Sequence, residues 1–233
     1  MDSSHEPGGA ELAFLGRLAQ ATSRRSFLKW SGVTLGVVAV GCSNDTTAPG
    51  ATVDLGTGDT AILNLAYVLE QLEAAYYGHV VDNFYKGVTT DEKQILIDIR
   101  DHEAAHRDFF RAALGANAIS QLQFNFIDID FTLRSDVLLT ARNFEDLGVA
   151  AYNGAGPLLM DPNLLMAAGS IVSVEARHAS AIRDLIAARN AATGFAGDDV
   201  VDAQGLDQAW TPNQVLTAAA PNVAATITAS NLP

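Results

Sequence analysis

Apolar residues recur every three or four positions along four long stretches of the chain, which is the spacing of an amphipathic helix. The stretches run from about Asp59 to Gly87, from Thr89 to about Gly115, from Leu133 to Ala155 and from Asp161 to about Arg189. Asp59 is expected to cap the first helix and Gly87 to end it. The second helix starts with the capping-box pair Thr89 and Glu92, and the fourth with Asp161 before a proline. The pattern predicts an all-α protein.

The lengths of the connections predict how these helices pair. Short loops join the first helix to the second and the third to the fourth, so each pair should form an antiparallel hairpin. Residues 116–132 lack the helical period and allow a crossover. The expected fold is an antiparallel four-helix bundle with a crossover between helices 2 and 3. After Gly194 the pattern becomes irregular, with at most one short helix, within residues 211–221, packed on the bundle.

Two of the four helices carry a glutamate and a histidine on the stripe that should face the core. Glu103 and His106 interrupt the apolar stripe of the second helix, and Glu175 and His178 interrupt that of the fourth. A spacing of three places both side chains of each pair on one helical face. One such pair is a weak indication of metal, but two copies on apolar stripes favour a metal site. His102 lies beside the stripe and is expected to be a rim residue.

The first and third helices each place a glutamate on the stripe that should face the core. For the first helix, an internal repeat indicates which glutamate this is. The segments LEQLEAAYYG and FEDLGVAAYN align without a gap and superpose Glu70 on Glu145, whereas Glu73 falls on Gly148. The periodicity of the first helix alone allows either Glu70 or Glu73 to face the core. The repeat favours Glu70, and we expect Glu73 to be a surface carboxylate at the edge of the stripe and not an extra ligand.

One glutamate and one Glu-x-x-His pair in each half resemble the ferritin-like superfamily, whose four-helix bundles hold two metal ions. Within it, the sequence resembles the branch of bacterial ferritin-like domain proteins related to plant desiccation-related proteins, and the resemblance covers about residues 59–190. It implies two ligand sets: Glu70, Glu103 and His106 for one metal, and Glu145, Glu175 and His178 for the other, with Glu103 and Glu175 bridging. It also implies that Tyr77 and Tyr152 hydrogen-bond ligand carboxylates of the opposite half.

The residue types themselves favour two metal ions. Four glutamates that converge in a core would repel one another and resist desolvation, and two divalent cations would neutralise them. Oxygen and imidazole ligands suit iron or manganese. A thiolate site is not expected, because the single cysteine, Cys42, precedes the bundle. Two ions about 3.5 to 4 Å apart can bind oxygen or peroxide between them.

The N-terminal region has the features of an export signal. The segment SRRSFLK, with Arg24 and Arg25, resembles the twin-arginine signature, and an apolar run over residues 31–41 follows it. This run ends at Cys42 in a sequence that resembles a lipobox, with ordinary cleavage nearby as the alternative. We expect export by the twin-arginine translocase to the periplasm or cell envelope, with a lipid anchor to the membrane at Cys42.

The expected organisation is a signal peptide over residues 1–42, a flexible tether over 43–58, the bundle over 59–194 and a mostly irregular C-terminal extension over 195–233. Four of the 14 Lys and Arg residues and three of the 27 Asp and Glu residues lie in the signal, so the remainder has a net charge of 10 − 24 = −14. Such acidity argues against a nucleic-acid partner, whose phosphates need a basic surface.

Two hypotheses about function follow from these observations. In the first, the protein is an exported redox protein with a dinuclear centre that oxidises Fe(II) or reacts with a small oxidant, oxygen or peroxide. In the second, it is a non-catalytic protein of the cell envelope that protects against desiccation or other stress. A complete set of six ligands favours the first.

Overall fold

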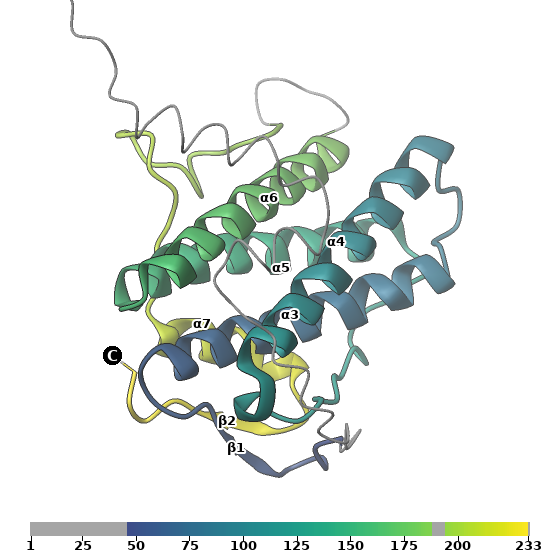
Figure 1. Ribbon diagram of the computed structural model, residues 1–233. Helices are drawn as coiled ribbons and strands as arrows, with labels where there is room; N and C mark the ends of the chain where they lie inside the picture. The colour runs from purple at the N-terminus through teal and green to yellow at the C-terminus, as the bar shows by residue number, and fades with distance from the viewer. Residues whose placement is uncertain (1–45, 188–193, 233) are drawn as a thin grey trace, which may run out of the picture. The chain divides into compact units, whose positions relative to one another are not determined.

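Four long helices dominate the computed structural model, which describes residues 46–187 and 194–232. They are α3 (Gly58–Asp82), α4 (Thr90–Leu114), α5 (Arg134–Ala155) and α6 (Pro162–Ile186). The expected all-α helical bundle is therefore confirmed (Figure 1). The predicted export signal with Arg24 and Arg25, and the predicted lipidation site Cys42, lie outside the described residues.

Two of these helices have the N-terminal side-chain caps that the sequence predicts. The Thr89 hydroxyl accepts a hydrogen bond from the Glu92 backbone N–H at 3.2 Å, and the Glu92 carboxylate accepts one from the Thr89 N–H at 2.9 Å. This capping box satisfies two backbone donors at the start of α4. The Asp161 carboxylate accepts from the backbone N–H of Asn163 at 2.8 Å and caps α6, whose first residue is Pro162.

The first helix differs from its expected bounds at both ends. Asp59 lies inside the first turn of α3, so it is not the N-cap. Its carboxylate instead accepts hydrogen bonds from the backbone N–H groups of Met160 and Asp161, at 2.8 and 2.9 Å. The helix ends at Asp82, and Gly87, with φ of 81°, lies in the following loop. A glycine adopts this left-handed conformation without steric cost, so Gly87 shapes the turn and does not end the helix.

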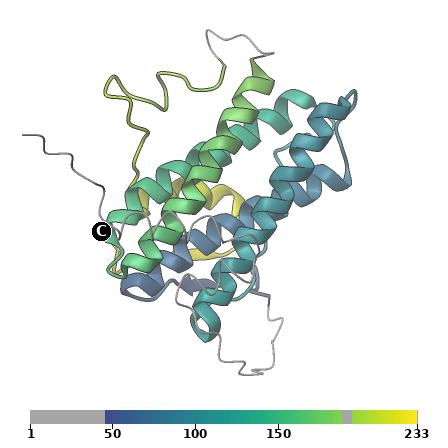
Figure 2. The ribbon, with the colours of Figure 1, turned by 45° about the horizontal axis from the view of Figure 1, so that its top comes forward.

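The helices pack as two hairpins, α3 with α4 and α5 with α6 (Figure 2). The chain between α4 and α5, which begins with the short 3-10 helix η1 (Gly115–Asn117), is attached to α3 by two buried side chains. Asn64 accepts a hydrogen bond from the backbone N–H of Ile119 at 3.1 Å, and Gln71 accepts one from that of Leu122 at 2.8 Å. The crossover is therefore held against α3.

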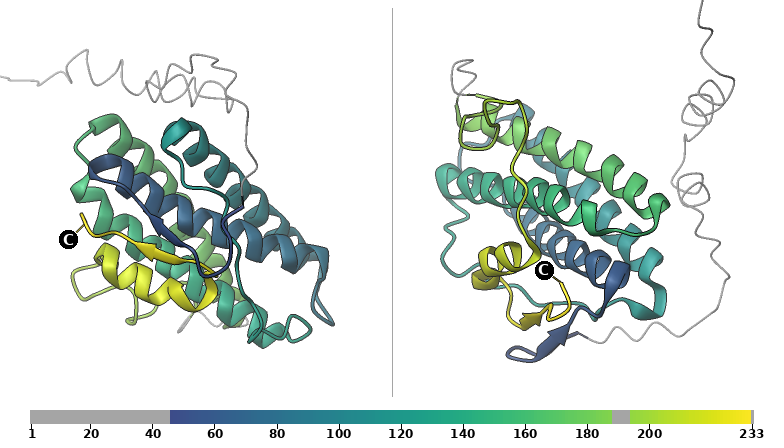
Figure 3. Two further views of the ribbon diagram at one scale, coloured as in Figure 1. Left: turned by 90° about the horizontal axis from the view of Figure 1, so that it is seen from below. Right: turned by 90° about the vertical axis from the view of Figure 1, so that its left-hand side faces the viewer.

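Part of the predicted tether belongs to the folded domain. Residues 52–54 form strand β1 (Thr52–Asp54), which pairs in parallel with β2 (Thr226–Thr228) near the C-terminus (Figure 3). Leu55, directly after β1, is completely buried. The expectation of a flexible tether is therefore wrong for residues 46–58, because backbone pairing and burial of Leu55 fix this segment to the bundle. No local pattern in the sequence indicates a partner strand about 170 residues away.

The C-terminal extension contains the one short helix that the sequence allowed. Helix α7 (Pro212–Ala219) packs against α5, and its Val215 is completely buried (Figure 3). Short 3-10 helices, η2 (Gly156–Leu158) and η3 (Ala220–Asn222), follow α5 and α7. Within residues 46–187 and 194–232, no helix combines the length and apolar character that a membrane span requires.

Candidate metal centre

Six predicted side chains meet in the middle of the bundle. They come from all four long helices: Glu70 from α3, Glu103 and His106 from α4, Glu145 from α5, and Glu175 and His178 from α6. All four glutamates are completely buried, at 0% exposure. Carboxylates are rarely buried so fully unless a cation or a hydrogen-bond network compensates them.

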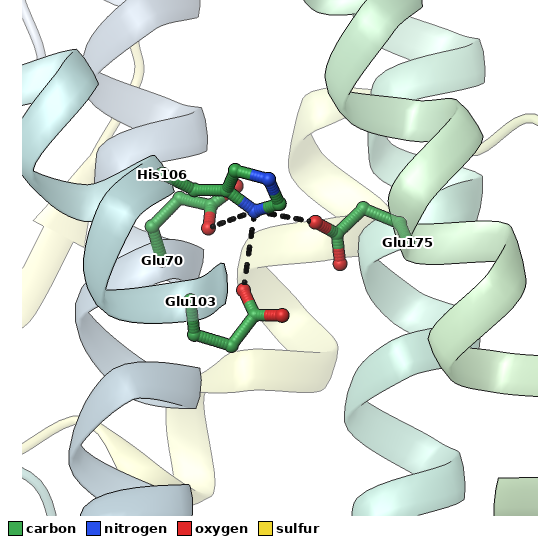
Figure 4. A group of neighbouring side chains, drawn as sticks. All are labelled: Glu70, Glu103, His106 and Glu175. Carbon is green, nitrogen blue, oxygen red and sulfur yellow. Dashed lines mark ion pairs between the residues drawn. The ribbon is translucent and has the colours of Figure 1, made fainter. Parts of the chain in front are cut away.

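The first group of ligand atoms surrounds His106 (Figure 4). Its Nδ1 lies 2.8 Å from Oε1 of Glu175, which reaches across from the second hairpin. The same nitrogen lies 3.4 Å from Oε2 of Glu70 and 3.5 Å from Oε2 of Glu103. One ligand atom from each of these four residues lies within 4.8 Å of the others, which is close enough for one ion to contact all four.

A second group surrounds His178 in the same way. Its Nδ1 lies 2.7 Å from Oε1 of Glu103, 3.4 Å from Oε2 of Glu145 and 3.9 Å from Oε2 of Glu175. Glu103 and Glu175 belong to both groups, each with its two oxygens directed to different histidines. This is the bridging arrangement that the resemblance implies, and metal binding by these residues stays a prediction.

The ligand atoms contact one another as close ion pairs, without the geometry of a hydrogen bond. Both oxygens of Glu103 and Glu175, and Nδ1 of His106 and of His178, are buried and have no hydrogen-bond partner among the described residues. Buried polar atoms normally have partners, and leaving them without one is costly. Converging donor atoms of this kind are the arrangement that a cation would complete. The residues present could therefore hold metal ions.

The charges of the cluster lead to the same conclusion. Burial, followed by repulsion from Glu103 and Glu70, raises the pKa of Glu175 well above its ordinary value. Burial raises the pKa of Glu70 to about 7, although His106 opposes this shift. Burial lowers the pKa of His178, but Glu145 and Glu103 outweigh it and raise that pKa to about 11. Burial therefore disfavours the ionised form of these glutamates, and bound cations would stabilise it.

Two tyrosines link the hairpins through this cluster. The Tyr77 hydroxyl on α3 donates a hydrogen bond to Oε1 of Glu145 on α5 at 2.5 Å. The Tyr152 hydroxyl on α5 donates to Oε1 of Glu70 on α3. Burial raises the pKa of both tyrosines well above the ordinary value, and the nearby carboxylates add to the shift, so both remain donors. This cross-pairing is the one that the resemblance implies, and it orients both glutamates.

Glu73 is buried, so the prediction that it is a surface carboxylate is wrong. It is only 2% exposed, and burial raises its pKa well above the ordinary value, with Glu103 and Glu175 adding to the shift. A Cβ atom at Gly148 would lie 3.2 Å from Oε1 of Glu73 and 3.6 Å from Oε2 of Glu175. The missing side chain at Gly148 therefore makes room for a fifth buried carboxylate. The repeat contained this signal, a glutamate in one half opposite a glycine in the other.

His102 also has a closer relation to the centre than the sequence suggested. Its Nδ1 lies 2.9 Å from Nε2 of His178, and the two rings are nearly parallel, at 8°, with centroids 5.1 Å apart. Burial, then His178 and His106, lower the pKa of His102, which favours a neutral ring. His102 is exposed and is not a member of either ligand group, as expected of a rim residue, yet it contacts a predicted ligand directly.

Comparison with known proteins agrees with this geometry. A family model described as a ferritin-like domain matches residues 58–188, which is more than half of the chain. The chain belongs to the ferritin-like domain family. The match spans all four long helices of this ferritin-like protein and every residue of the candidate centre. A search of curated proteins finds none that matches it.

Proposed function

We propose that this ferritin-like protein binds two divalent metal ions, iron or manganese, and carries out redox chemistry with oxygen or peroxide. The observation that supports it best is the pair of overlapping ligand groups that share Glu103 and Glu175. Each group offers one imidazole and three carboxylates, and several of their buried atoms lack a hydrogen-bond partner among the described residues.

The ligand chemistry narrows the choice of metal. Carboxylate and imidazole ligands suit iron and manganese, and neither group contains a cysteine. When bound, two such ions would exchange electrons with a small oxidant or, in a ferroxidase, with Fe(II) as the substrate. The same donor set supports ferroxidase, peroxidase and catalase chemistry.

The protein's own residues would position the centre and control access to it. Tyr77 and Tyr152 hold Glu145 and Glu70 by hydrogen bonds, and buried apolar residues of the four helices exclude water from the surroundings. His106 is the most exposed of the six predicted ligands, with 13% of its side chain accessible compared with 5% for His178. A small reactant would therefore approach on the His106 side.

A non-catalytic role is the second candidate, and the burial of the centre favours it. The four glutamates have no accessible surface, so metal ions held by them could act mainly as a structural link between the hairpins. Such a protein would serve in protection of the cell envelope against desiccation or other stress. We also propose that the protein is related to the desiccation-related branch of the family.

Export is proposed on the sequence motifs alone. Arg24 and Arg25 lie in a twin-arginine-like segment, and Cys42 ends the apolar run that follows it. We infer translocation of the folded domain to the periplasm or cell envelope and lipid attachment at Cys42. Mass spectrometry of the mature N-terminus tests the anchor: a lipid-modified Cys42 at the first position is expected, and a mature protein that starts elsewhere excludes it.

Elemental analysis of protein purified from its own host, with absorption spectra before and after exposure to oxygen and to peroxide, tests the main proposal. About two iron or manganese ions per chain and an oxidant-dependent spectrum are expected. Two ions with no spectral response to either oxidant would favour the structural role. A folded protein without metal, which also fails to take up added Fe(II) or Mn(II), would overturn both metal roles.

A further inference from the structure

The two halves of the centre differ in how their histidines are held. Nε2 of His178 contacts Nδ1 of His102 at 2.9 Å, whereas the ion pairs of His106 with the described residues all involve its Nδ1. The difference comes from the sequence. His102 directly precedes Glu103 in the first half, and Val174 directly precedes Glu175 in the second. The apolar side chain of Val174 cannot form with His106 the hydrogen bond that His102 forms with His178.

The contact between His102 and His178 fixes a tautomer. Nδ1 of His178 faces Glu103, Glu145 and Glu175, so in a metal centre this nitrogen is the ligand atom and carries no proton. The ring proton then lies on Nε2, which donates to Nδ1 of His102. An imidazole that binds metal through one nitrogen normally donates from the other, usually to a carboxylate, a backbone carbonyl or water. Here the acceptor is a second imidazole on the neighbouring helix α4.

We propose that His102 is a positioning residue that orients His178 and fixes its tautomer, so that the two metal positions have unequal affinities. This inference rests on the proposed metal binding. The position served by His178 is the tighter one, because its imidazole is fixed by a hydrogen bond and only 5% exposed. The position served by His106 is weaker, because that ring has no such partner among the described residues and is 13% exposed. Metal should therefore load and leave in two distinct steps.

Removal of the hydrogen-bond acceptor tests the assignment. The full chain, freed of metal, is titrated with Mn(II), and the binding isotherm and the rate of chelator-induced release are recorded. Wild-type protein should bind two ions with different affinities. In His102→Ala, the tighter step should weaken by about 10- to 100-fold, the effect usual for loss of a partner of a metal-bound histidine, while the weaker step stays unchanged. Asparagine offers an oxygen acceptor, so His102→Asn should restore most of the affinity.

His79→Ala is the matched control, because His79 is also an exposed histidine but packs against Phe131, with ring centroids 4.0 Å apart, away from both ligand groups. It should leave both binding steps unchanged. Far-ultraviolet circular dichroism checks that every variant is folded.

The outcomes separate the two proposals. Wild-type protein that binds no metal would refute the proposed function itself. Wild-type protein that binds two ions, with a His102→Ala variant that binds both as tightly, would refute only the role of His102. Equal weakening of both steps in His102→Ala, without rescue by asparagine, would also refute it, because the residue would then act on the fold as a whole.

Discussion

The Tyr77 hydroxyl donates a hydrogen bond of 2.5 Å to Glu145, across the interface between the two hairpins. Tyr152 makes the reciprocal bond to Glu70, so each hairpin orients a glutamate of the other. Because all four residues are buried, the centre and the hairpin interface are one structural unit. Changes that disturb the centre should therefore also change the stability of the bundle.

Tyr77→Phe should weaken both metal binding and folding. The variant leaves Oε1 of the buried Glu145 without its donor, which should lower the free energy of unfolding by about 1 to 3 kcal/mol. Metal affinity should fall by roughly 10- to 100-fold. Tyr76→Phe is the control, since Tyr76 is equally buried but donates to the backbone carbonyl of Val137 at 2.6 Å. Chemical denaturation and metal titration of both variants should show loss of metal affinity in the Tyr77 variant alone.

Of the two glutamates on α3, Glu70 should be a metal ligand and Glu73 a neutral neighbour. Glu70→Ala and Glu145→Ala should each reduce the number of metal ions per chain, because each removes one member of a ligand group. Glu73→Gln should retain both ions, because burial raises the pKa of Glu73 and so favours the neutral carboxyl, which glutamine resembles. Elemental analysis of the purified variants measures this. Loss of metal in the Glu73 variant would instead make Glu73 a ligand.

Gly148→Ala should destabilise the protein although alanine favours helices. Its methyl group would lie 3.2 Å from Oε1 of Glu73, so the carboxylate must move within a packed core, at a cost of roughly 1 to 3 kcal/mol. Gly169→Ala on α6 is the matched control, because nothing lies within 4 Å of a Cβ there. It should stabilise the helix by up to about 1 kcal/mol. Thermal unfolding of the two variants should therefore shift in opposite directions.

Glu92 should make stability depend on pH at the acidic end. Burial would raise the pKa of Glu92, but the backbone N–H of Thr89 and the Arg134 guanidinium, 2.7 Å away, lower it below the ordinary value. A lowered folded pKa stabilises the protein above the unfolded pKa of about 4.3, and this contribution is lost as the pH falls through the folded value. The stability difference between wild type and Glu92→Gln should thus be largest near neutrality and shrink below about pH 4. A difference that does not change with pH would contradict the assignment.

Metal removal should lower stability at neutral pH. Without cations the cluster combines several buried carboxylates with two imidazoles, and repulsion together with desolvation disfavours the folded state. Addition of Mn(II) at about 100 times its dissociation constant should restore roughly 2.7 kcal/mol per independent site. Calorimetric unfolding of the chelator-treated protein, with and without Mn(II), measures the effect. Mg(II), which prefers octahedral oxygen coordination, is the control ion and should restore less.

The sequence determined the elements whose causes are local. The helical period, the capping pair Thr89 and Glu92, and the N-cap Asp161 fixed where helices lie, because these signals depend on residues a few positions apart. The spacing of three in each Glu-x-x-His pair, together with the internal repeat, selected the six residues that the structure brings together. The repeat sufficed because the two hairpins place equivalent residues at equivalent depths in the bundle.

Only the tertiary structure decided the features that depend on contacts between distant segments. Gly148 leaves space that buries Glu73, and the place of His102 beside His178 depends on how α4 packs against α6. The segment expected to be a tether pairs with a strand near the C-terminus, which no local pattern indicates. Each of these departs from the symmetry of the repeat or lies outside it, so packing across the fold, and not spacing along the chain, determines it.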